Sequence, residues 1–296
     1  MAIRYIKNCT GDDCEGERKS SQVISKIIFY LLLVSFVAVF TYMLFFSQYL
    51  KVGNIEIVGT LELSSQEMKQ GMEDSMQGKY FGIIPKNNFL FFSQKNVEKL
   101  LTDNYKKIRT VTVTKKFPDT INIVIDERKA LLVWCAREEC YLLDEQGFAY
   151  SVADFSSPEL MQNHLLQIND ASGREVSIGS KIIEPAYEQY VLSIKDELAK
   201  IGFNVTDQYW TPSRMAEEIN VKTDQDLEFY FSTQFELKSA LDTLNIILKK
   251  EIPKEKEAEI AYIDLRNENK AFYRFKNVEP VSENLEVAGE EVKKEE

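Results

Sequence analysis

An uncharged run of 24 residues near the N-terminus constrains the fold of this chain more than any other feature. Residues 27–50 read IIFYLLLVSFVAVFTYMLFFSQYL and are flanked by Lys26 and Lys51. As a helix the run is roughly 36 Å long at about 1.5 Å per residue, enough to cross a hydrocarbon core of about 30 Å. A run that is apolar on every face is not typical of a buried globular helix of this length. The run therefore predicts a transmembrane helix.

A cleaved signal peptide is the main alternative to a membrane anchor. The run is longer than the apolar core of a normal signal peptide, and its last residues, SQYL at 47–50, contain no small-x-small cleavage site. An uncleaved anchor is the better interpretation. The N-terminal segment, 1–26, is richer in basic residues than the twenty residues after the run, so the positive-inside rule predicts a cytoplasmic N-terminus. The basic residues are Arg4, Lys7, Arg18, Lys19 and Lys26 before the run, and Lys51 and Lys69 after it.

Length and charge limit the class of protein further. The 296 residues leave room for two modest domains besides the anchor, and 44% of them are hydrophobic, which is enough for real cores. A net charge of −11 argues against a nucleic-acid-binding protein, which would need a basic surface. Residues 278–296 hold seven Glu, two Lys and no aromatic side chain. Such a segment buries too little apolar surface to fold, so we expect a disordered acidic tail at 277–296.

The clearest β pattern lies at residues 108–134, IRTVTVTKKFPDTINIVIDERKALLVW. Apolar and polar side chains alternate on both sides of a turn, which predicts two half-buried strands. Pro118 fixes φ in that turn, and the carboxylate of Asp119 can cap it. This hairpin follows a strand at 54–58 and two helices, one opened by a capping box at 64–67 and one opened by Ser93. We therefore expect a small α+β domain at 51–127, with two helices covering one face of a three-stranded sheet.

A second, β-rich domain is predicted at 128–276. Residues 185–201 are expected to form a helix with Pro185 in its first turn. Residues 234–250 carry an apolar stripe that predicts an amphipathic helix packed on the sheet, stopped by Pro253. The expected strands of this domain are 130–135, 140–143, 147–152, a weaker one at 165–168, then 217–222, 227–232, 260–265 and 271–276.

The four cysteines divide into two pairs across the predicted membrane. Cys135 and Cys140 flank a four-residue hairpin loop on the oxidising side, and either a disulfide or two reduced strand thiols would fit. Cys9 and Cys14 lie on the reducing side. Two thiols are too few for a metal site, and the single histidine of the chain, His164, is across the membrane, so a loose cytoplasmic tail is the simpler interpretation.

No residues form a recognisable catalytic constellation. His164 stands among MQNHLL at 161–166, which contains no nucleophile motif, and the glycines occur singly, so no phosphate-binding loop is present. We expect neither an enzyme nor a cofactor, and no small-molecule substrate.

Protein binding has a physical argument at the last expected strand. Residues 271–276, AFYRFK, are followed only by the polar tail. If the strand lies at a sheet edge, its outer N–H and C=O groups are unpaired and can receive a strand from a partner. The aromatic side chains of the strand either form pockets for that partner or face the core. Because side chains alternate, Phe272 and Tyr273 must point to opposite faces.

Five short motifs in their order along the chain resemble the FtsQ/DivIB family of bacterial cell-division proteins. They read VGNIEIVG at 52–59, FPDTI at 117–121, DERKA at 126–130 leading to Trp134, YLLDEQGF at 141–148, and IDLR at 263–266. The resemblance covers about 51–276 and departs at Asn267, where the family often has an aromatic residue. It implies a short cytoplasmic tail, one membrane helix, a membrane-proximal POTRA domain with βααββ order and a C-terminal β domain.

The resemblance also implies partners and a site. Proteins of this family receive the membrane-anchored partners FtsB and FtsL on the C-terminal strands of the β domain, which helps to bring the septal peptidoglycan synthase to midcell. The interface would then lie on Arg266, Asn267, Ala271, Phe272, Tyr273, Arg274 and Phe275. The expected function is a non-enzymatic scaffold of the divisome in the plasma membrane.

Two other classes remain as alternatives. A POTRA-containing module of protein secretion or outer-membrane assembly usually has several POTRA copies and a β-barrel, whereas this sequence predicts one POTRA domain and an apolar helix. An anchored sensor would need a cytoplasmic output module, and 26 residues are too few to fold one.

Overall fold

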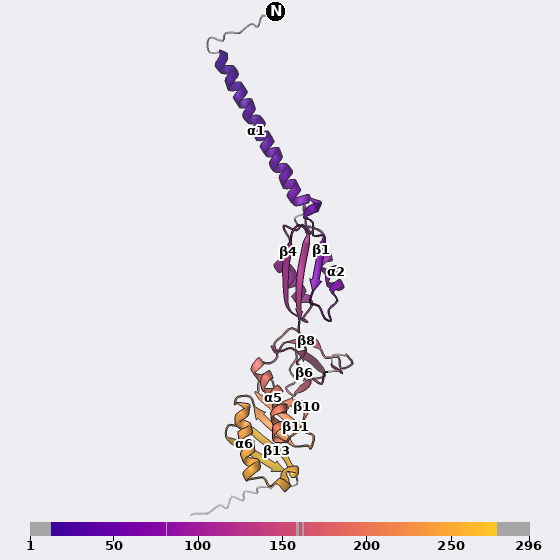
Figure 1. Ribbon diagram of the computed structural model, residues 1–296, viewed down its shortest axis with the longest axis vertical. Helices are drawn as coiled ribbons and strands as arrows, with labels where there is room; N and C mark the ends of the chain where they lie inside the picture. Colours follow the sequence, from indigo (N-terminus) through magenta and orange to yellow (C-terminus); the bar gives the residue numbers. More distant parts are fainter. Residues whose placement is uncertain (1–12, 81, 158–159, 162, 277–296) are drawn as a thin grey trace, which may run out of the picture. The chain divides into compact units, whose positions relative to one another are not determined.

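The computed structural model describes residues 13–276 except 81, 158–159 and 162, and its chain divides into two compact units (Figure 1). The first unit ends at Glu127 and the second begins at Arg128. Cys9 and the acidic segment 277–296 lie outside the described residues, as does the side chain of Cys14.

The apolar run lies in helix α1, Asp13–Phe46, which is followed by the short 3-10 helix η1, Gln48–Leu50. Within α1, Val23–Phe46 is long and apolar enough to cross a membrane. The predicted span of 27–50 is shifted by four residues from this stretch, and α1 begins within residues 1–26, which were expected to form a loose tail. The helix ends at Phe46 because Ser47 is extended, and the side chain of Ser47 accepts a hydrogen bond from the Tyr49 N–H at 3.2 Å.

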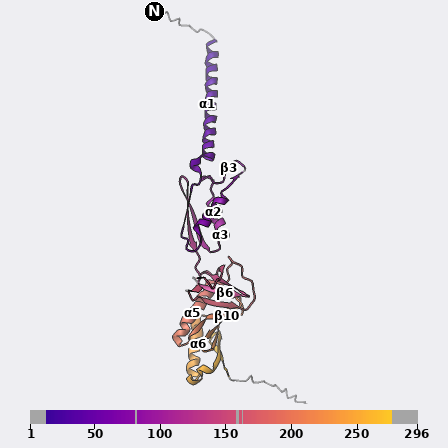
Figure 2. The same ribbon diagram turned by 90° about the vertical axis from the view of Figure 1, so that its right-hand side faces the viewer.

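The rest of the first unit is a three-stranded sheet with two helices. The sheet order is β1-β5-β4, with β1 parallel to β5 and β4 antiparallel to β5. Helices α2 and α3 lie on the same side of this sheet (Figure 2). The predicted βααββ order is confirmed, and a short hairpin, β2–β3, is inserted between the helices. The elements are β1 Asn54–Val58, α2 Ser65–Ser75, β2 Lys79–Tyr80, β3 Ile84–Pro85, α3 Gln94–Asn104, β4 Ile108–Lys116 and β5 Thr120–Glu127.

Local signals in the sequence account for the way these elements begin. The side chain of Ser64 accepts a hydrogen bond from the Glu67 N–H at the start of α2, and Ser93 accepts one from the Asn96 N–H at the start of α3. Gly59 ends β1 with φ of 90°, and a Cβ there would lie 2.1 Å from the carbonyl oxygen of Ile125. Only glycine fits such a position.

The second unit is built on a nine-stranded sheet. Its strands lie in the order β14-β13-β12-β11-β10-β9-β6-β7-β8. Parallel pairs join β6 to β9, β9 to β10 and β12 to β13, and the other neighbours are antiparallel. The strands are β6 Leu132–Ala136, β7 Glu139–Leu143, β8 Ala149–Val152, β9 Leu166–Asp170, β10 Val205–Thr211, β11 Glu218–Thr223, β12 Glu228–Ser232, β13 Ile260–Asn267 and β14 Lys270–Phe275. The helices are α5 Pro185–Ile201, α6 Leu237–Lys250 and the 3-10 helix η2 Lys254–Glu259.

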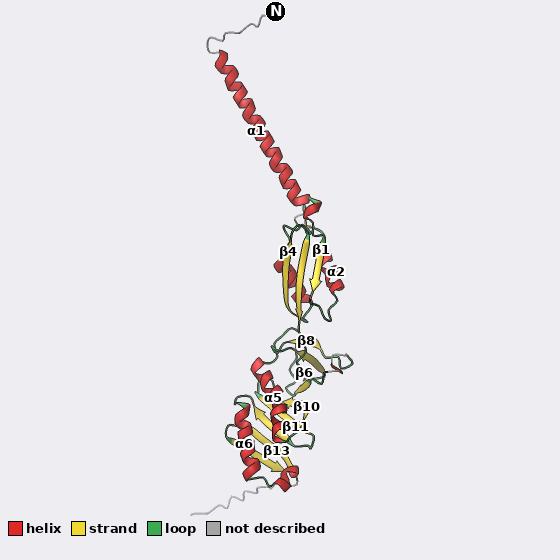
Figure 3. Cartoon of the chain, in the orientation of Figure 1, coloured by secondary structure: helices red, strands yellow, loops and turns green. Residues whose placement is uncertain are grey.

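Each face of this sheet is covered differently. Helices α5 and α6 lie on one face of it (Figure 3). The main core lies under them and includes Val191, Leu244 and Phe229. On the opposite face, a smaller cluster centred on Val133 and Tyr150 packs with residues of the segment between β8 and β9. We call the face opposite α5 and α6 the outer face.

One strand of this sheet was not predicted from the sequence. Residues 205–211, VTDQYWT, form β10, which pairs with both β9 and β11. The side chains of this strand do alternate between the two faces of the sheet, but the inward positions 207 and 211 hold Asp and Thr and the outward position 210 holds Trp. The apolar residues of VTDQYWT therefore show no period of two. Cys135 and Cys140 are paired across the β6–β7 hairpin and are joined by a disulfide bond.

Candidate partner-binding edge of the second unit

Strand β14 is one edge of the nine-stranded sheet (Figure 1). Among the residues that the structure describes it pairs with β13 alone, and the two are joined by a tight turn in which Asn269 has φ of 60°. Asparagine tolerates this left-handed conformation better than most residues. At the other end of β14, Lys276 donates its N–H to the carbonyl of Glu259, and its ammonium group donates to the carbonyl oxygens of Gln225 and Ala258. The strand is therefore fixed at both ends.

The two faces of β14 have different roles. Ala271, Tyr273 and Phe275 are half-buried and pack against the main core, and the last two rings meet edge-to-face at 5.7 Å. Phe272 and Arg274 lie on the outer face, and the Phe272 side chain is 57% exposed. The alternation expected for Phe272 and Tyr273 therefore places Phe272 outward and Tyr273 inward.

Arg266 organises the outer face next to this edge. Its guanidinium donates to Asp264 at 2.6 and 2.9 Å and to Glu218 at 2.9 Å, and it lies 5.5 Å from the centre of the Tyr230 ring. The hydrogen bond to Asp264 raises the pKa of Arg266. Burial would raise the pKa of Asp264, but hydrogen bonds from the side chain and the N–H of Arg266 outweigh it and lower that pKa. Both groups are therefore charged at neutral pH.

A row of outward side chains crosses the sheet beside Arg266. Trp210 is registered with Asn220, Asn220 with Tyr230, Tyr230 with Asp264, and Asp264 with Phe272. Tyr230 also stacks on Tyr262 with ring centres 5.4 Å apart. Tyrosine, tryptophan and arginine are the residues most common at the energetic centres of protein interfaces. The sequence prediction placed no site residue on β10, β11 or β12. The alternation of EFYFS at 228–232, with Phe229 and Phe231 buried, is the one signal that indicates an outward Tyr230.

The other predicted site residues lie at the end of β13 and in the β6–β7 hairpin. Asn267 is exposed at the end of β13, where it is registered with Lys270. Cys135 and Cys140 contact the smaller core on the outer face, at the far end of the sheet order from β14. The structure thus brings Arg266 and Phe272 to one face, and it turns Ala271, Tyr273 and Phe275 to the other.

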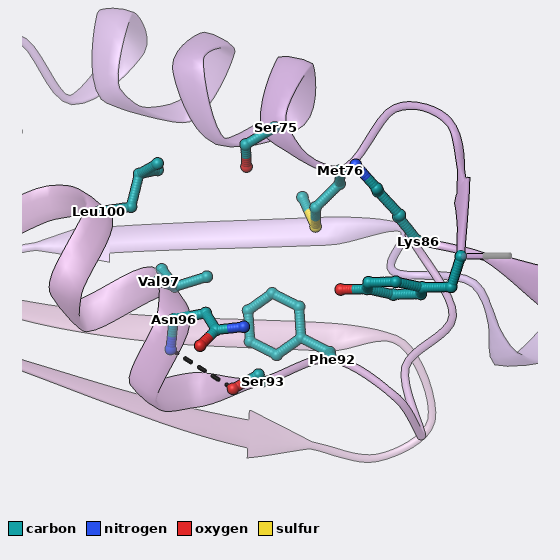
Figure 4. Close-up of a pocket in the computed structure, with 9 residues that line it drawn as sticks. Ser75, Met76, Lys86, Phe92, Ser93, Asn96, Val97 and Leu100 are labelled. Carbon is teal, nitrogen blue, oxygen red and sulfur yellow. Dashed lines mark hydrogen bonds between the residues drawn. The ribbon is translucent and has the colours of Figure 1, made fainter.

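A cavity of about 220 Å³ lies in the first unit between α2, α3 and the β2–β3 hairpin (Figure 4). Met76, Phe92, Val97 and Leu100 line its apolar part, and Lys86 is at its edge. The hydroxyl of Ser93 and the N–H of Asn96 face one another there, joined by the helix cap. Among the described residues, no carboxylate, thiol or histidine lines this cavity, and its polar groups are the side chains of Ser75, Tyr80, Lys86, Ser93 and Asn96.

The single histidine and the possible metal ligands are the other candidates for a chemical site among the described residues. His164 is exposed in the loop before β9. Within residues 13–276, as far as the structure describes them, no group of three or more His, Cys, Asp or Glu side chains is arranged to hold a metal ion.

Comparison with known proteins shows what the chain is similar to. Residues 50–128 match the family model described as "POTRA domain, FtsQ-type". The chain is 27% identical over 267 residues to cell division protein FtsQ of Chloroflexus aurantiacus, across 88% of this chain and 85% of the relative. It is 21% identical over 267 residues to cell division protein DivIB of Clostridium botulinum, across 86% of this chain and 93% of the relative. The resemblance to the FtsQ/DivIB family is confirmed.

A further relative covers part of the chain. Cell division protein DivIB of Clostridium acetobutylicum is 27% identical over 122 residues, across 40% of this chain and 48% of the relative. Together with the apolar helix, these matches support a cell-division membrane protein of the FtsQ/DivIB type. Its POTRA domain at 50–128 and its β-rich C-terminal region confirm the predicted fold class.

Proposed function

We propose that this chain is a non-enzymatic, bitopic scaffold of the bacterial divisome. Its N-terminus would be cytoplasmic, and strand β14 would receive membrane-anchored partners of the FtsB/FtsL type at the septum, in support of septal peptidoglycan synthesis. The FtsQ-type description of the matched POTRA model favours this function over a role in secretion or outer-membrane assembly.

The exposed edge of β14 is the observation that carries the proposal. An edge strand presents unpaired N–H and C=O groups, to which an extended partner segment can add as a further strand. Phe272 stands beside that edge with more than half of its side chain in solvent, and Arg266 is held in place next to it by two carboxylates. The backbone would supply affinity, and these two side chains would supply specificity. The α1 anchor would raise the effective concentration of partners held in the same membrane.

The test of this site is photo-crosslinking in cells of the source organism. Benzoylphenylalanine in place of Phe272 should crosslink to an FtsB- or FtsL-type protein identified by mass spectrometry. The matched control is the same substitution at Val152, a comparably exposed residue of β8, the opposite edge of the sheet. Equal crosslinking at both positions, or none at 272, would exclude the β14 interface.

A substitution separates binding from folding. Phe272→Asp should weaken binding of the full chain to the crosslinked partner by on the order of tenfold or more, because a central aromatic contact is lost. The fold should persist, since the side chain is mostly in solvent. Tyr273→Asp is not a clean test, because that ring packs on the main core. Wild-type affinity of the Phe272→Asp chain would contradict the proposal, and normal septation after depletion would contradict the division role itself.

A further inference from the structure

The C-terminal end of α1 is held by a loop of the POTRA domain. Asn88 is 1% exposed, and its side-chain amide donates to the carbonyl oxygens of Leu44 and Phe45 at 2.9 and 3.2 Å. These carbonyls belong to the last turn of the helix, which lacks intrahelical donors. The rings of Phe45 and Phe91 also stack with centres 5.0 Å apart. The last turn of the apolar helix and the loop that contains Asn88 therefore form one packed structure.

Three segments meet at this end of the domain. The Phe89 N–H donates to the Leu50 carbonyl at 2.7 Å, and the Val52 N–H donates to the Asn87 carbonyl at 2.8 Å. The Gly53 N–H donates to the carbonyl of Asp119, in the turn between β4 and β5, at 2.9 Å. We call these segments, residues 47–53, 82–92 and 115–119, the helix-proximal end. Figure 2 shows β3, which belongs to it, beside the end of α1.

Large apolar side chains project into solvent from the helix-proximal end. The Tyr49 side chain is 84% exposed and that of Phe117 is 74% exposed. Ile83, Leu90 and Phe91 are exposed as well. Elsewhere among the described residues of the POTRA domain, exposed large apolar side chains are fewer and scattered: Val58, Leu61, Tyr80 and Val124. A group of exposed apolar side chains in one place indicates a binding surface.

The charge of this end is opposite to that of the whole chain. The residues of this end carry four lysines and one acidic residue, Asp119, which gives +3, whereas the chain carries −11. Lys115 is used internally, because its ammonium group donates to the Phe89 carbonyl at 2.9 Å. Lys51 and Lys116 are exposed, and neither forms an ion pair with a residue that the structure describes. The four lysines are Lys51, Lys86, Lys115 and Lys116.

We propose that the helix-proximal end is a lipid-binding surface that sits in the headgroup region of the leaflet from which α1 emerges and prefers anionic phospholipids. Continuity with the membrane-spanning helix identifies the occupant, since Asn88 fixes these loops to the last turn of that helix. Aromatic side chains concentrate at membrane–water interfaces, where their apolar rings and polar edges are both satisfied. Lysines near the end of a membrane helix extend to the phosphates, and each is attracted to an anionic surface. The surface thus binds lipid, and strand β14 remains the proposed site for protein partners.

The test uses the full chain in lipid nanodiscs and measures depth by spin-label accessibility. In a Cys9→Ser/Cys14→Ser background, a nitroxide is attached at Phe117→Cys, and at Leu61→Cys as the control. Leu61 is 75% exposed, close to the value for Phe117, but it lies at the other end of β1, beside Glu127. In discs that contain phosphatidylglycerol, we expect the label at 117 to be more accessible to oxygen than to a nickel chelate. We expect the label at 61 to show the reverse.

Charge reversal tests the preference for anionic lipid. Lys51→Glu/Lys116→Glu should reduce the oxygen preference of the label at 117 in phosphatidylglycerol discs, as should discs of phosphatidylcholine alone. The matched control, Lys99→Glu/Lys106→Glu, makes the same change in net charge elsewhere in the domain and should leave the label unaffected. A label at 117 that is as water-accessible as the label at 61 in both kinds of disc would overturn the proposal. An oxygen preference that is insensitive both to lipid charge and to Lys51→Glu/Lys116→Glu would overturn the anionic preference.

Discussion

Asp144 is the residue on which the turn after β7 is built. Its carboxylate is fully buried, accepts hydrogen bonds from the N–H groups of Gln146 and Phe148 at 3.0 and 2.9 Å, and forms an ion pair with Arg128. Gly147 completes the turn with φ of 75°, and a Cβ there would lie 2.1 Å from the Ile183 carbonyl oxygen. The YLLDEQGF motif that carries the family resemblance thus has a structural explanation: a buried acceptor, and a position that only glycine can fill.

Glu188, in the first turn of α5, is a buried carboxyl. It is 1% exposed, and its Oε1 atom accepts no hydrogen bond from a described residue. Burial, followed by the negative charges of Asp144 and Glu145, raises the pKa of Glu188 to about 7 from an ordinary 4.5. The folded state therefore holds this proton more tightly than the unfolded state does. The neutral carboxyl of Glu188 therefore favours the folded state fully below about pH 4.5, and this contribution to the free energy of unfolding is lost as the pH rises to about 7.

We therefore expect Glu188→Gln to flatten the pH dependence of stability between about pH 4.5 and 7. Above pH 7 the variant should be more stable than the wild type, by about 2–3 kcal/mol at most, because no charge is buried. Urea unfolding followed by tryptophan fluorescence measures this difference. Asp196→Asn, an exposed substitution on the same helix, is the control and should keep the wild-type pH dependence. An unchanged pH slope in Glu188→Gln would contradict the assignment.

At the scale of elements, strands with strict alternation could be predicted from the sequence. Strands β4 and β5 and the N-caps of α2 and α3 were found because each depends on neighbouring residues. Strand β10 was missed because Asp207 and Thr211 occupy inward positions and Trp210 an outward one, which hides the alternation. Its pairing with β9 and β11 is set by distant segments. Helix α1 begins before the predicted span of 27–50, since a hydrogen-bond ladder does not stop where an apolar run begins.

The candidate site could be predicted in part. A sequence in which only a polar tail follows the last strand indicates an edge, and alternation separates Phe272 from Tyr273. Neither tells which of the two faces the core, because that depends on how β14 is registered with β13. Glu218, the second carboxylate on Arg266, lies 48 positions away in the sequence, and no local pattern connects the two.

The β6–β7 hairpin is the element whose stability depends on redox state. Its disulfide closes a short loop, since Cys135 and Cys140 are five positions apart in the sequence. Such a bond restricts the unfolded chain, and for so short a loop the expected contribution is about 2 kcal/mol. We expect reduction of the full chain by dithiothreitol to lower the stability of the second unit by this amount, measured by urea unfolding with tryptophan fluorescence. The Cys135→Ala/Cys140→Ala chain should not respond to the reductant. A wild-type chain equally stable with and without reductant would contradict the prediction.

At the scale of the whole molecule, the adjacent residues Glu127 and Arg128 each form contacts within a different unit. Glu127 is buried, and its carboxylate accepts hydrogen bonds from the N–H groups of Leu61, Glu62 and Leu63 at 2.8, 3.2 and 3.1 Å, all within the first unit. Arg128 pairs with Asp144 and lies 4.9 Å from the centre of the Phe148 ring, all within the second unit. The DER motif at 126–128 therefore ends one domain and begins the next, without a flexible linker sequence between them.

This arrangement predicts that substitutions one position apart destabilise different units. Glu127→Ala leaves three N–H groups without their acceptor and should destabilise the POTRA domain by about 1–3 kcal/mol. Arg128→Met leaves the buried Asp144 unpaired and should destabilise the second unit by about 3 kcal/mol. Both tryptophans, Trp134 and Trp210, belong to the second unit, so their fluorescence reports its unfolding alone. Hydrogen exchange of the β5 amides reports the first unit.

In full-length chain, Glu127→Ala should accelerate exchange in β5 and leave the fluorescence transition in place, whereas Arg128→Met should do the reverse. Separate cores give independent unfolding when few interactions join them. If either substitution shifts both measurements equally, the two units unfold as one cooperative structure and the boundary between Glu127 and Arg128 has no energetic meaning.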